Sequence, residues 1–249
     1  YPKDDEARER AEIMLKGVDN GIQRLREIVN DMIDVSLIDN DMLQINYQPV
    51  WLNQLLGIAT QDSQPSADGR SIRLIVEKFT GEDELTFGDP ERLYQDLRNI
   101  LTNAIKYTPD NGKIVVSGRK LPGFIEITVA DTGIGIDPHD QERIFEKFGR
   151  LGNAALHSSG KVKFKGGGPG LGLPITKGII EAHGGAIWAE SDGHNENTCP
   201  GSTFHVLLPI IKESPDEKIN KIFEPITSGK LSKNLEDQEV QDKELDYQE

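Results

Sequence analysis

The chain has 249 residues, of which 36% are hydrophobic and 28% charged, and its formal net charge at pH 7 is -14. This composition predicts a folded acidic protein and disfavours nucleic-acid binding, because an acidic surface repels phosphates. The single cysteine, Cys199, excludes an internal disulfide and any multi-cysteine zinc site within this sequence. No apolar run approaches the roughly 20 residues of a membrane span, so we expect no membrane contact.

The first predicted element is a long helix over residues 4 to 39. Apolar residues recur there in steps of three and four, namely Leu15, Val18, Ile22, Leu25, Val29 and Met32. This spacing is that of a coiled-coil seam, which a lone helix cannot bury. The chain starts at Tyr1 without Met and offers no matching second helix. We therefore expect the partner helix in another chain or in a preceding segment.

Helices and strands then follow without regular alternation. An extended link (45–50), a helix (52–59) and a strand (72–79) precede a helix that Asp89 and Pro90 begin. Further strands are predicted at 112–120, 123–131, 186–191 and 201–209, and a helix at 175–185. This irregular mixture predicts an α+β fold.

The chain divides into three parts on these patterns. Residues 1–44 hold the long helix, residues 45–211 form the α+β domain, and residues 212–249 have few large apolar residues and an excess of acid. Such a segment buries too little apolar surface to order itself alone, so we expect a tail or linker with at most transient helix.

Two asparagines recur on one face of the helix that begins at Pro90. In NILTNAIKYT, Asn99, Asn103, Lys106 and Tyr107 share that face, while Leu97, Ile100, Leu101, Ala104 and Ile105 form the opposite, apolar face. Amide oxygens suit Mg²⁺ when phosphates and water complete its shell, and an ammonium can meet a phosphate. The spacing is consistent with a nucleotide site, although the same asparagines would also suit a solvated helix face.

Two glycine-rich stretches follow. DTGIGI places Asp131 at the end of a predicted strand, where Gly133 and Gly135 let the backbone approach a ligand. KGGGPGLGLPITKG places glycines directly before a helix, so that free N–H groups and the positive end of the helix dipole face the loop. The second stretch predicts an anion cradle that is neither a Walker P-loop nor a dinucleotide fingerprint.

In this order along the chain, the stretches resemble the ATP-binding domain of sensor histidine kinases, in the superfamily of gyrase, chaperone and MutL ATPases. NILTNAIKYTP resembles that family's N box, DTGIGI its G1 box, FEKFGR its F box, GGGPGLGL its G2 box and GSTFHVLLP its closing strand. The resemblance implies a Bergerat-type fold, a two-layer α/β sandwich with helices on one face of a mixed sheet. The long first helix resembles the second helix of the family's dimerisation and phosphoacceptor hairpin.

The resemblance implies ATP and Mg²⁺ as ligands. Asn103 would coordinate Mg²⁺, with Asn99 close to the metal and its waters. Lys106 would contact phosphate and Tyr107 would pack on the adenine. Arg150, at the end of the F box, would reach the γ-phosphate. Catalysis would then depend on Asn99, Asn103, Lys106 and Arg150.

The resemblance also implies how the nucleotide is selected. Asp131 would accept a hydrogen bond from the adenine amino group, partly through a water shared with Thr203, which favours adenine over guanine. The other implied contacts are Gly133, Gly135 and Ile136 at the adenine and Gly168, Gly170, Leu171 and Gly172 at the triphosphate.

Two features depart from the family pattern. Pro169 stands where the family usually has threonine, which removes a hydroxyl and an N–H, and we expect compensation from Lys161, Lys163 and Lys165 in a long lid. The phosphoacceptor pattern His-Glu-Leu-Arg-Thr-Pro does not occur. The five histidines all fall within or beside the predicted ATP-binding domain: His139, His157, His183, His194 and His205. We therefore expect the chain to begin just after the first hairpin helix.

These patterns predict the catalytic part of a histidine kinase that acts on a histidine outside this chain. We expect relay to an aspartate of a response regulator, a homodimer formed through the first helix, and a cytoplasmic location, with a parent protein that can be membrane-anchored. Two alternatives stay open. An ATPase of the gyrase and MutL branch needs a glutamate base where this chain has Asn99, whose amide cannot take a proton. A degenerate binding module would account for Pro169.

Overall fold

A five-stranded mixed sheet forms the centre of the protein. The computed structural model describes residues 2–147, 164 and 170–227. The sheet has the order β2 (Arg73–Val76), β4 (Lys113–Leu121), β5 (Phe124–Asp131), β7 (Ser202–Pro209) and β6 (Ala186–Glu190). β2 and β4 pair in parallel and the other neighbours pair antiparallel. The strands predicted from the sequence are all present.

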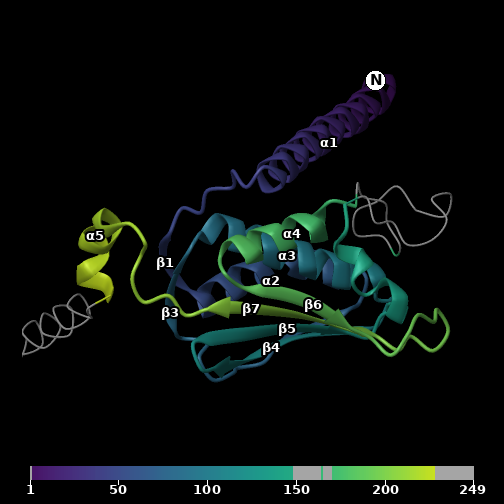
Figure 1. The fold of residues 1–249 in the computed structure, drawn as a ribbon. Coiled ribbons are helices and arrows are strands. Elements are labelled where there is room, and N and C mark those ends of the chain that lie inside the picture. The colour runs from purple at the N-terminus through teal and green to yellow at the C-terminus, as the bar shows by residue number, and fades with distance from the viewer. Residues whose placement is uncertain (1, 148–163, 165–169, 228–249) are drawn as a thin grey trace, which may run out of the picture.

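Three helices cover one face of this sheet (Figure 1): α2 (Leu52–Asp68), α3 (Pro90–Tyr107) and α4 (Gly172–Ala182). The core lies between the two layers, where Ile100 of α3, Ile127 of β5 and Ile180 of α4 are almost completely buried. The predicted α+β class and two-layer α/β sandwich are therefore confirmed.

Local sequence explains where α3 begins and ends. Asp89 is the N-cap, and its Oδ1 accepts the Arg92 N–H at 3.1 Å, while Pro90 occupies the first turn. At the other end, the Thr108 hydroxyl donates to the Ala104 carbonyl at 2.7 Å. The apolar face of α3 is buried in the core, so its polar face points away from the core.

A second, two-stranded sheet was not predicted. β1 (Gln48–Trp51) pairs antiparallel with β3 (Leu85–Gly88), and α2 continues to Asp68 although the sequence suggested an end near residue 59. Pro65 lies inside α2, where its fixed φ is helical but its ring lacks an N–H. Short 3-10 helices follow the sheet at η1 (Pro138–Asp140) and η2 (Arg143–Phe145).

The helix α1 (Pro2–Asp39) is present as predicted and extends away from the domain (Figure 1). Its C-terminal part contacts α4, where Val35 and Ile38 pack against Ile175 and Ile179. Asp34, which is buried, accepts hydrogen bonds from Arg92 at 2.6 Å and from Gln95 at 3.1 Å.

The predicted seam residues of α1, from Leu15 to Met32, remain 51–68% exposed in this single chain. None of the helices in the described residues combines the length and apolar character needed to cross a bilayer.

The described part of the expected tail is ordered into a helix, α5 (Glu217–Thr227), which contacts β1 (Figure 1). Asn220 Oδ1 accepts the Ser214 N–H at 2.6 Å, and Asn220 Nδ2 donates to the Ser214 carbonyl at 2.8 Å, which holds the segment before the helix. Residues 228–249 lie outside the described residues.

Candidate nucleotide-binding site

A cleft of about 790 Å³ lies along the polar face of α3. Its walls come from α1, α3, the segment after β5, the N-terminal end of α4, β7 and the loop between β6 and β7. The predicted site residues that line it are Asn99, Asn103, Lys106, Tyr107, Asp131, Gly135, Ile136, Gly170 and Gly172. Segments that are far apart in sequence thus meet in one cleft.

The side chain of Asn99 bridges α3 and α4. Its Nδ2 donates to the Gly172 carbonyl and to the Thr176 hydroxyl, both at 3.3 Å. Because an amide carries only two hydrogens on nitrogen, both are used, and the carbonyl oxygen of Asn99 makes neither bond. Asn99 therefore offers an acceptor and no further donor to a ligand in the cleft.

The donor set fits Mg²⁺ bound together with phosphates. Asn99 and Asn103 contribute neutral amide groups to the cleft, one helical turn apart. No group of three or more His, Cys, Asp or Glu side chains among the described residues could hold a metal alone. A hard cation here would need oxygen ligands from a substrate and from water, which is how Mg²⁺ usually binds at nucleotide sites.

Lys106 and Tyr107 form the next part of the wall. Lys106 Nζ lies 4.6 Å from the centroid of the Tyr107 ring, which is cation–π geometry. The ammonium therefore stays at the cleft, next to the turn that bears Asn103.

Asp131 lines the cleft and is buried. Burial raises the pKa of its carboxyl to about 6, and hydrogen bonds from the Gly133 N–H and from Ser202 oppose the rise. The Gly133 N–H donates to Asp131 Oδ1 at 2.7 Å. The carboxyl is thus fixed as an acceptor on the wall where an exocyclic amine can reach it.

Glycine is required at both predicted positions after Asp131. A Cβ on Gly133 would lie 2.5 Å from Asp131 Oδ1 and 2.6 Å from the Tyr107 carbonyl oxygen. Gly135 has a φ of +75°, and a Cβ there would lie 2.0 Å from the Gly193 carbonyl oxygen. The backbone therefore occupies space that a side chain would need, which keeps this wall of the cleft thin.

The residue of β7 beside Asp131 is Ser202, which corrects the expectation for Thr203. Ser202 pairs directly with Asp131 across β5 and β7 and lines the cleft, as Phe204 does. Thr203 pairs with Ala130 and is not among the lining residues of the described cleft. Successive side chains of a strand point to opposite faces of the sheet, so a shift of one residue along β7 decides which side chain faces the cleft.

The glycine-rich stretch is described from Gly170 onward. Gly170 has a φ of +76°, Leu171 is buried in the contact between α1 and α4, and α4 begins at Gly172 with its N-terminal end at the cleft. The first N–H groups of a helix have no intrahelical acceptor and favour an anion. Five other predicted or compensating residues lie outside the described residues: Arg150, Lys161, Lys163, Lys165 and Gly168. Pro169 lies outside them as well.

The loop at 193–200, between β6 and β7, lies against the segment after β5. Gly135 and His194 form an antiparallel bridge, and the Asn195 N–H donates to the Ile134 carbonyl at 2.8 Å. His194 lines the cleft, and its Nδ1 lies 3.2 Å from the Gly135 carbonyl oxygen, so Nδ1 carries the donated hydrogen.

Comparisons with known proteins give a family match over the part of the chain that holds most of this cleft. Residues 88–212 match the family model of histidine kinase-, DNA gyrase B- and HSP90-like ATPases. The circadian input-output histidine kinase CikA of Synechococcus elongatus is 31% identical over 202 residues, which are 81% of this chain and 25% of CikA. The chain spans between 22% and 46% of the first curated relatives it matches.

Solved structures give the same result. The nucleotide-free catalytic domain of the histidine kinase ThkA has a TM-score of 0.54 and 27% identity, and the match covers 67% of this chain and 97% of that domain. ThkA in complex with the response regulator TrrA matches with a TM-score of 0.54 and 25% identity, over 75% of this chain and 49% of that one.

Proposed function

We propose a phosphotransfer function for this chain on the premise that it belongs to the family of histidine kinase-, DNA gyrase B- and HSP90-like ATPases and carries the ATP-binding part of a sensor histidine kinase. Its reaction is transfer of the γ-phosphoryl group of ATP to a histidine that lies outside residues 1–249. The observation that carries this proposal is Asn99. Its amide is held by Gly172 and Thr176 and has no basic atom that could deprotonate water.

Each described residue has a defined task in this proposal. The Asp131 carboxylate accepts the adenine amino group, and Tyr107 covers the ring. Lys106 and the N-terminal N–H groups of α4 bind phosphate oxygens, which holds the γ-phosphorus in line with an incoming imidazole nitrogen.

Asn103 and the oxygen of Asn99 would hold Mg²⁺. When bound, the metal would neutralise charge on the phosphates.

The partners of the reaction follow the same proposal. The ThkA structure that contains TrrA supports a response regulator as the phosphoryl acceptor after the histidine. The exposed apolar seam of α1, from Leu15 to Met32, supports a homodimer through this helix.

The proposal is tested by mixing the chain with a peptide helix that carries the His-Glu-Leu-Arg-Thr-Pro pattern, Mg²⁺ and ATP labelled at the γ-phosphorus. We expect an acid-labile label on the peptide histidine. Asn103→Ala should abolish labelling. Gln64→Ala, on the exposed side of α2, is the matched control and should leave it unchanged.

Failure to label the peptide while ATP binds normally would contradict phosphotransfer. Rapid release of inorganic phosphate by the chain alone would support the hydrolase instead.

A further inference from the structure

A loop at 191–201, which connects β6 to β7, is hydrogen-bonded to the turn at 133–136 that borders the cleft. The Gly201 N–H donates to the carbonyl of the first residue of this turn at 2.9 Å. The Asn195 N–H donates to the carbonyl of the second residue at 2.8 Å. These two bonds join backbone to backbone, so they depend little on the side chains of the loop.

The peptide unit between Gly135 and Ile136 is held differently, by side chains of the loop. His194 Nδ1 lies 3.2 Å from the Gly135 carbonyl oxygen and donates its hydrogen to it, since a carbonyl can only accept. On the same peptide unit, the Ile136 N–H donates to the Ser191 hydroxyl at 3.0 Å. A peptide unit is planar, so these two contacts fix the orientation of one rigid plane.

Gly135 makes this plane easy to rotate. Its φ is +75°, and a residue without Cβ can adopt several backbone conformations of similar energy. Rotation of the plane would turn the Gly135 carbonyl and redirect Ile136, which is buried and lines the cleft. A side-chain hydrogen bond to that carbonyl therefore selects one shape of this wall of the cleft.

We propose that His194 is a positioning residue for the base of ATP and that it acts through the Gly135 carbonyl. His194 is exposed and lines the cleft, and the reaction described above gives it no task. By holding the carbonyl, it keeps the turn at 133–136 in the shape that lets a flat base lie between this wall and Tyr107. The inference rests on the proposed function, because that function assigns adenine to this end of the cleft.

The size and the selectivity of the effect follow from this arrangement. A wall that is already ordered spares the cost of ordering it when the base binds. Loss of one intramolecular hydrogen bond typically changes an equilibrium about two- to tenfold. The phosphates are assigned to Lys106 and to the N-terminal end of α4, away from this turn, so only binding of the base should change.

The test compares His194→Ala, His194→Asn and the control Gln141→Ala. Asparagine can place its amide nitrogen close to the position of the histidine Nδ1, so it keeps a donor for Gly135 without the ring. Gln141 Nε2 donates to the Ser191 carbonyl at 2.7 Å, so its removal loosens the same loop without removing the bond to Gly135.

Two measurements are made on each variant. Calorimetry with Mg²⁺ gives the affinity for ATP and for inorganic triphosphate, which has no base. Hydrogen exchange of the Ile136 amide in the nucleotide-free chain needs neither metal nor ligand. Thermal unfolding gives the stability of each variant.

We expect His194→Ala to lower the ATP affinity about two- to tenfold, to leave the triphosphate affinity unchanged and to speed exchange of the Ile136 amide. His194→Asn should restore the ATP affinity and the slow exchange, because it still donates to the Gly135 carbonyl. Gln141→Ala should lower the melting temperature and leave the ratio of the two affinities unchanged.

Three results would overturn the proposal. Unchanged ATP affinity and exchange in His194→Ala would show that the backbone bonds of the loop hold the turn by themselves. An equal loss of ATP and triphosphate affinity would indicate a general loosening of the domain. A His194→Asn variant as weak as His194→Ala would show that the bond to Gly135 is not what matters.

The proposed function can fail separately. A wild-type chain that binds no ATP with Mg²⁺ would contradict that function, while exchange of the Ile136 amide would still decide whether His194 holds the turn.

Discussion

Asparagine in place of Asp131 should stabilise the nucleotide-free domain and weaken ATP binding. The wild-type carboxyl has a pKa of about 6 in the fold and 3.8 in its absence, and desolvation by burial is the main cause. At a pH between 3.8 and about 6, the Asp131 carboxyl is protonated in the folded state and ionised in the unfolded state. Stability from this group is therefore complete below pH 3.8 and is lost as the pH rises through about 6.

The magnitude follows from the shift. A rise of about 2 pKa units corresponds to about 3 kcal/mol against the ionised form at pH 8. The Asp131→Asn side chain would keep an oxygen for the Gly133 N–H but would bury an amide, so we expect a net gain of about 2 kcal/mol. For a domain of this size that gain raises the melting temperature by roughly 4–8 °C.

Scanning calorimetry of wild type and Asp131→Asn at pH 8 and pH 5 measures this effect. The difference in melting temperature should shrink at pH 5, where the wild-type carboxyl is mostly neutral. ATP affinity should fall at least about tenfold, since the bond to a charged acceptor is lost. Asp192→Asn, in an exposed loop, is the matched control and should change neither property.

A variant that is less stable than wild type at pH 8, or a stability difference that is equal at both pH values, would refute this account of Asp131.

Other perturbations test separate parts of the structure. Burial lowers the pKa of His183, so the fold favours its neutral imidazole. The stability that this group contributes should therefore be lost as the pH falls below the ordinary histidine pKa. His183→Gln should remove this part of the acid sensitivity, as measured by thermal unfolding at several pH values. Gly135→Ala should cost about 2 kcal/mol or more in chemical denaturation and weaken ATP binding, because its φ is +75° and a Cβ would lie 2.0 Å from the Gly193 carbonyl oxygen. Arg92→Ala leaves the buried Asp34 without its 2.6 Å partner, and it should destabilise the contact between α1 and α3 by about 2 kcal/mol. Faster hydrogen exchange at residues 30–39 would report that loss, and unchanged exchange would contradict it.

Much of the fold was predictable because its signals are local. The cap at Asp89 with Pro90, together with the apolar periodicity of α3, identified that helix and the polar face that lines the cleft. The alternating strands β4 and β5 and their short connection were likewise recognisable from neighbouring residues. β1 was missed, since a four-residue strand has almost no pattern of its own and is defined by pairing with β3.

The candidate site, like the fold, was predictable only where neighbouring residues carry the signal. Asn99, Asn103 and Asp131 could be named from the sequence, because the motifs that contain them, in this order along the chain, resemble those of the histidine kinase family. Ser202 in place of Thr203 could not, since only the register of β7 against β5 decides which side chain faces the cleft.

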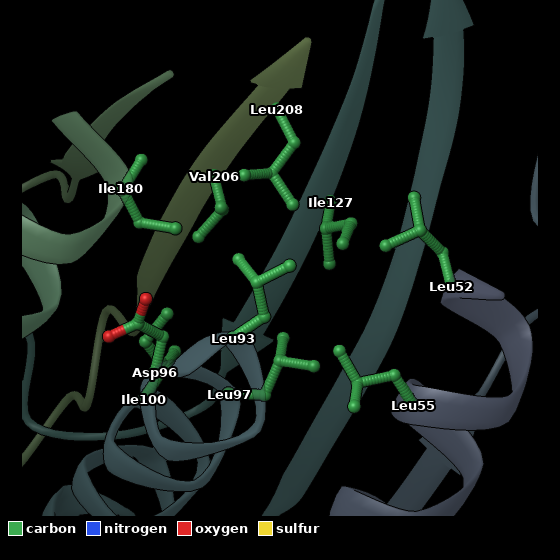
Figure 2. Close-up of a pocket in the computed structure, with 10 residues that line it drawn as sticks. All are labelled: Leu52, Leu55, Leu93, Asp96, Leu97, Ile100, Ile127, Ile180, Val206 and Leu208. Atoms are coloured by element: carbon green, nitrogen blue, oxygen red, sulfur yellow. The ribbon is translucent and has the colours of Figure 1, made fainter. Parts of the chain in front are cut away.

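Asp96 belongs to the same group as Ser202. In sequence it is a polar residue at a helical position, and only the packing of α3 within the core removes its carboxyl from water (Figure 2). Helix caps, periodicity and glycine spacing act over a few bonds and can be read along the chain. Burial, register and the direction of a hydrogen bond arise between segments far apart in sequence, so they exist only once the tertiary structure has formed.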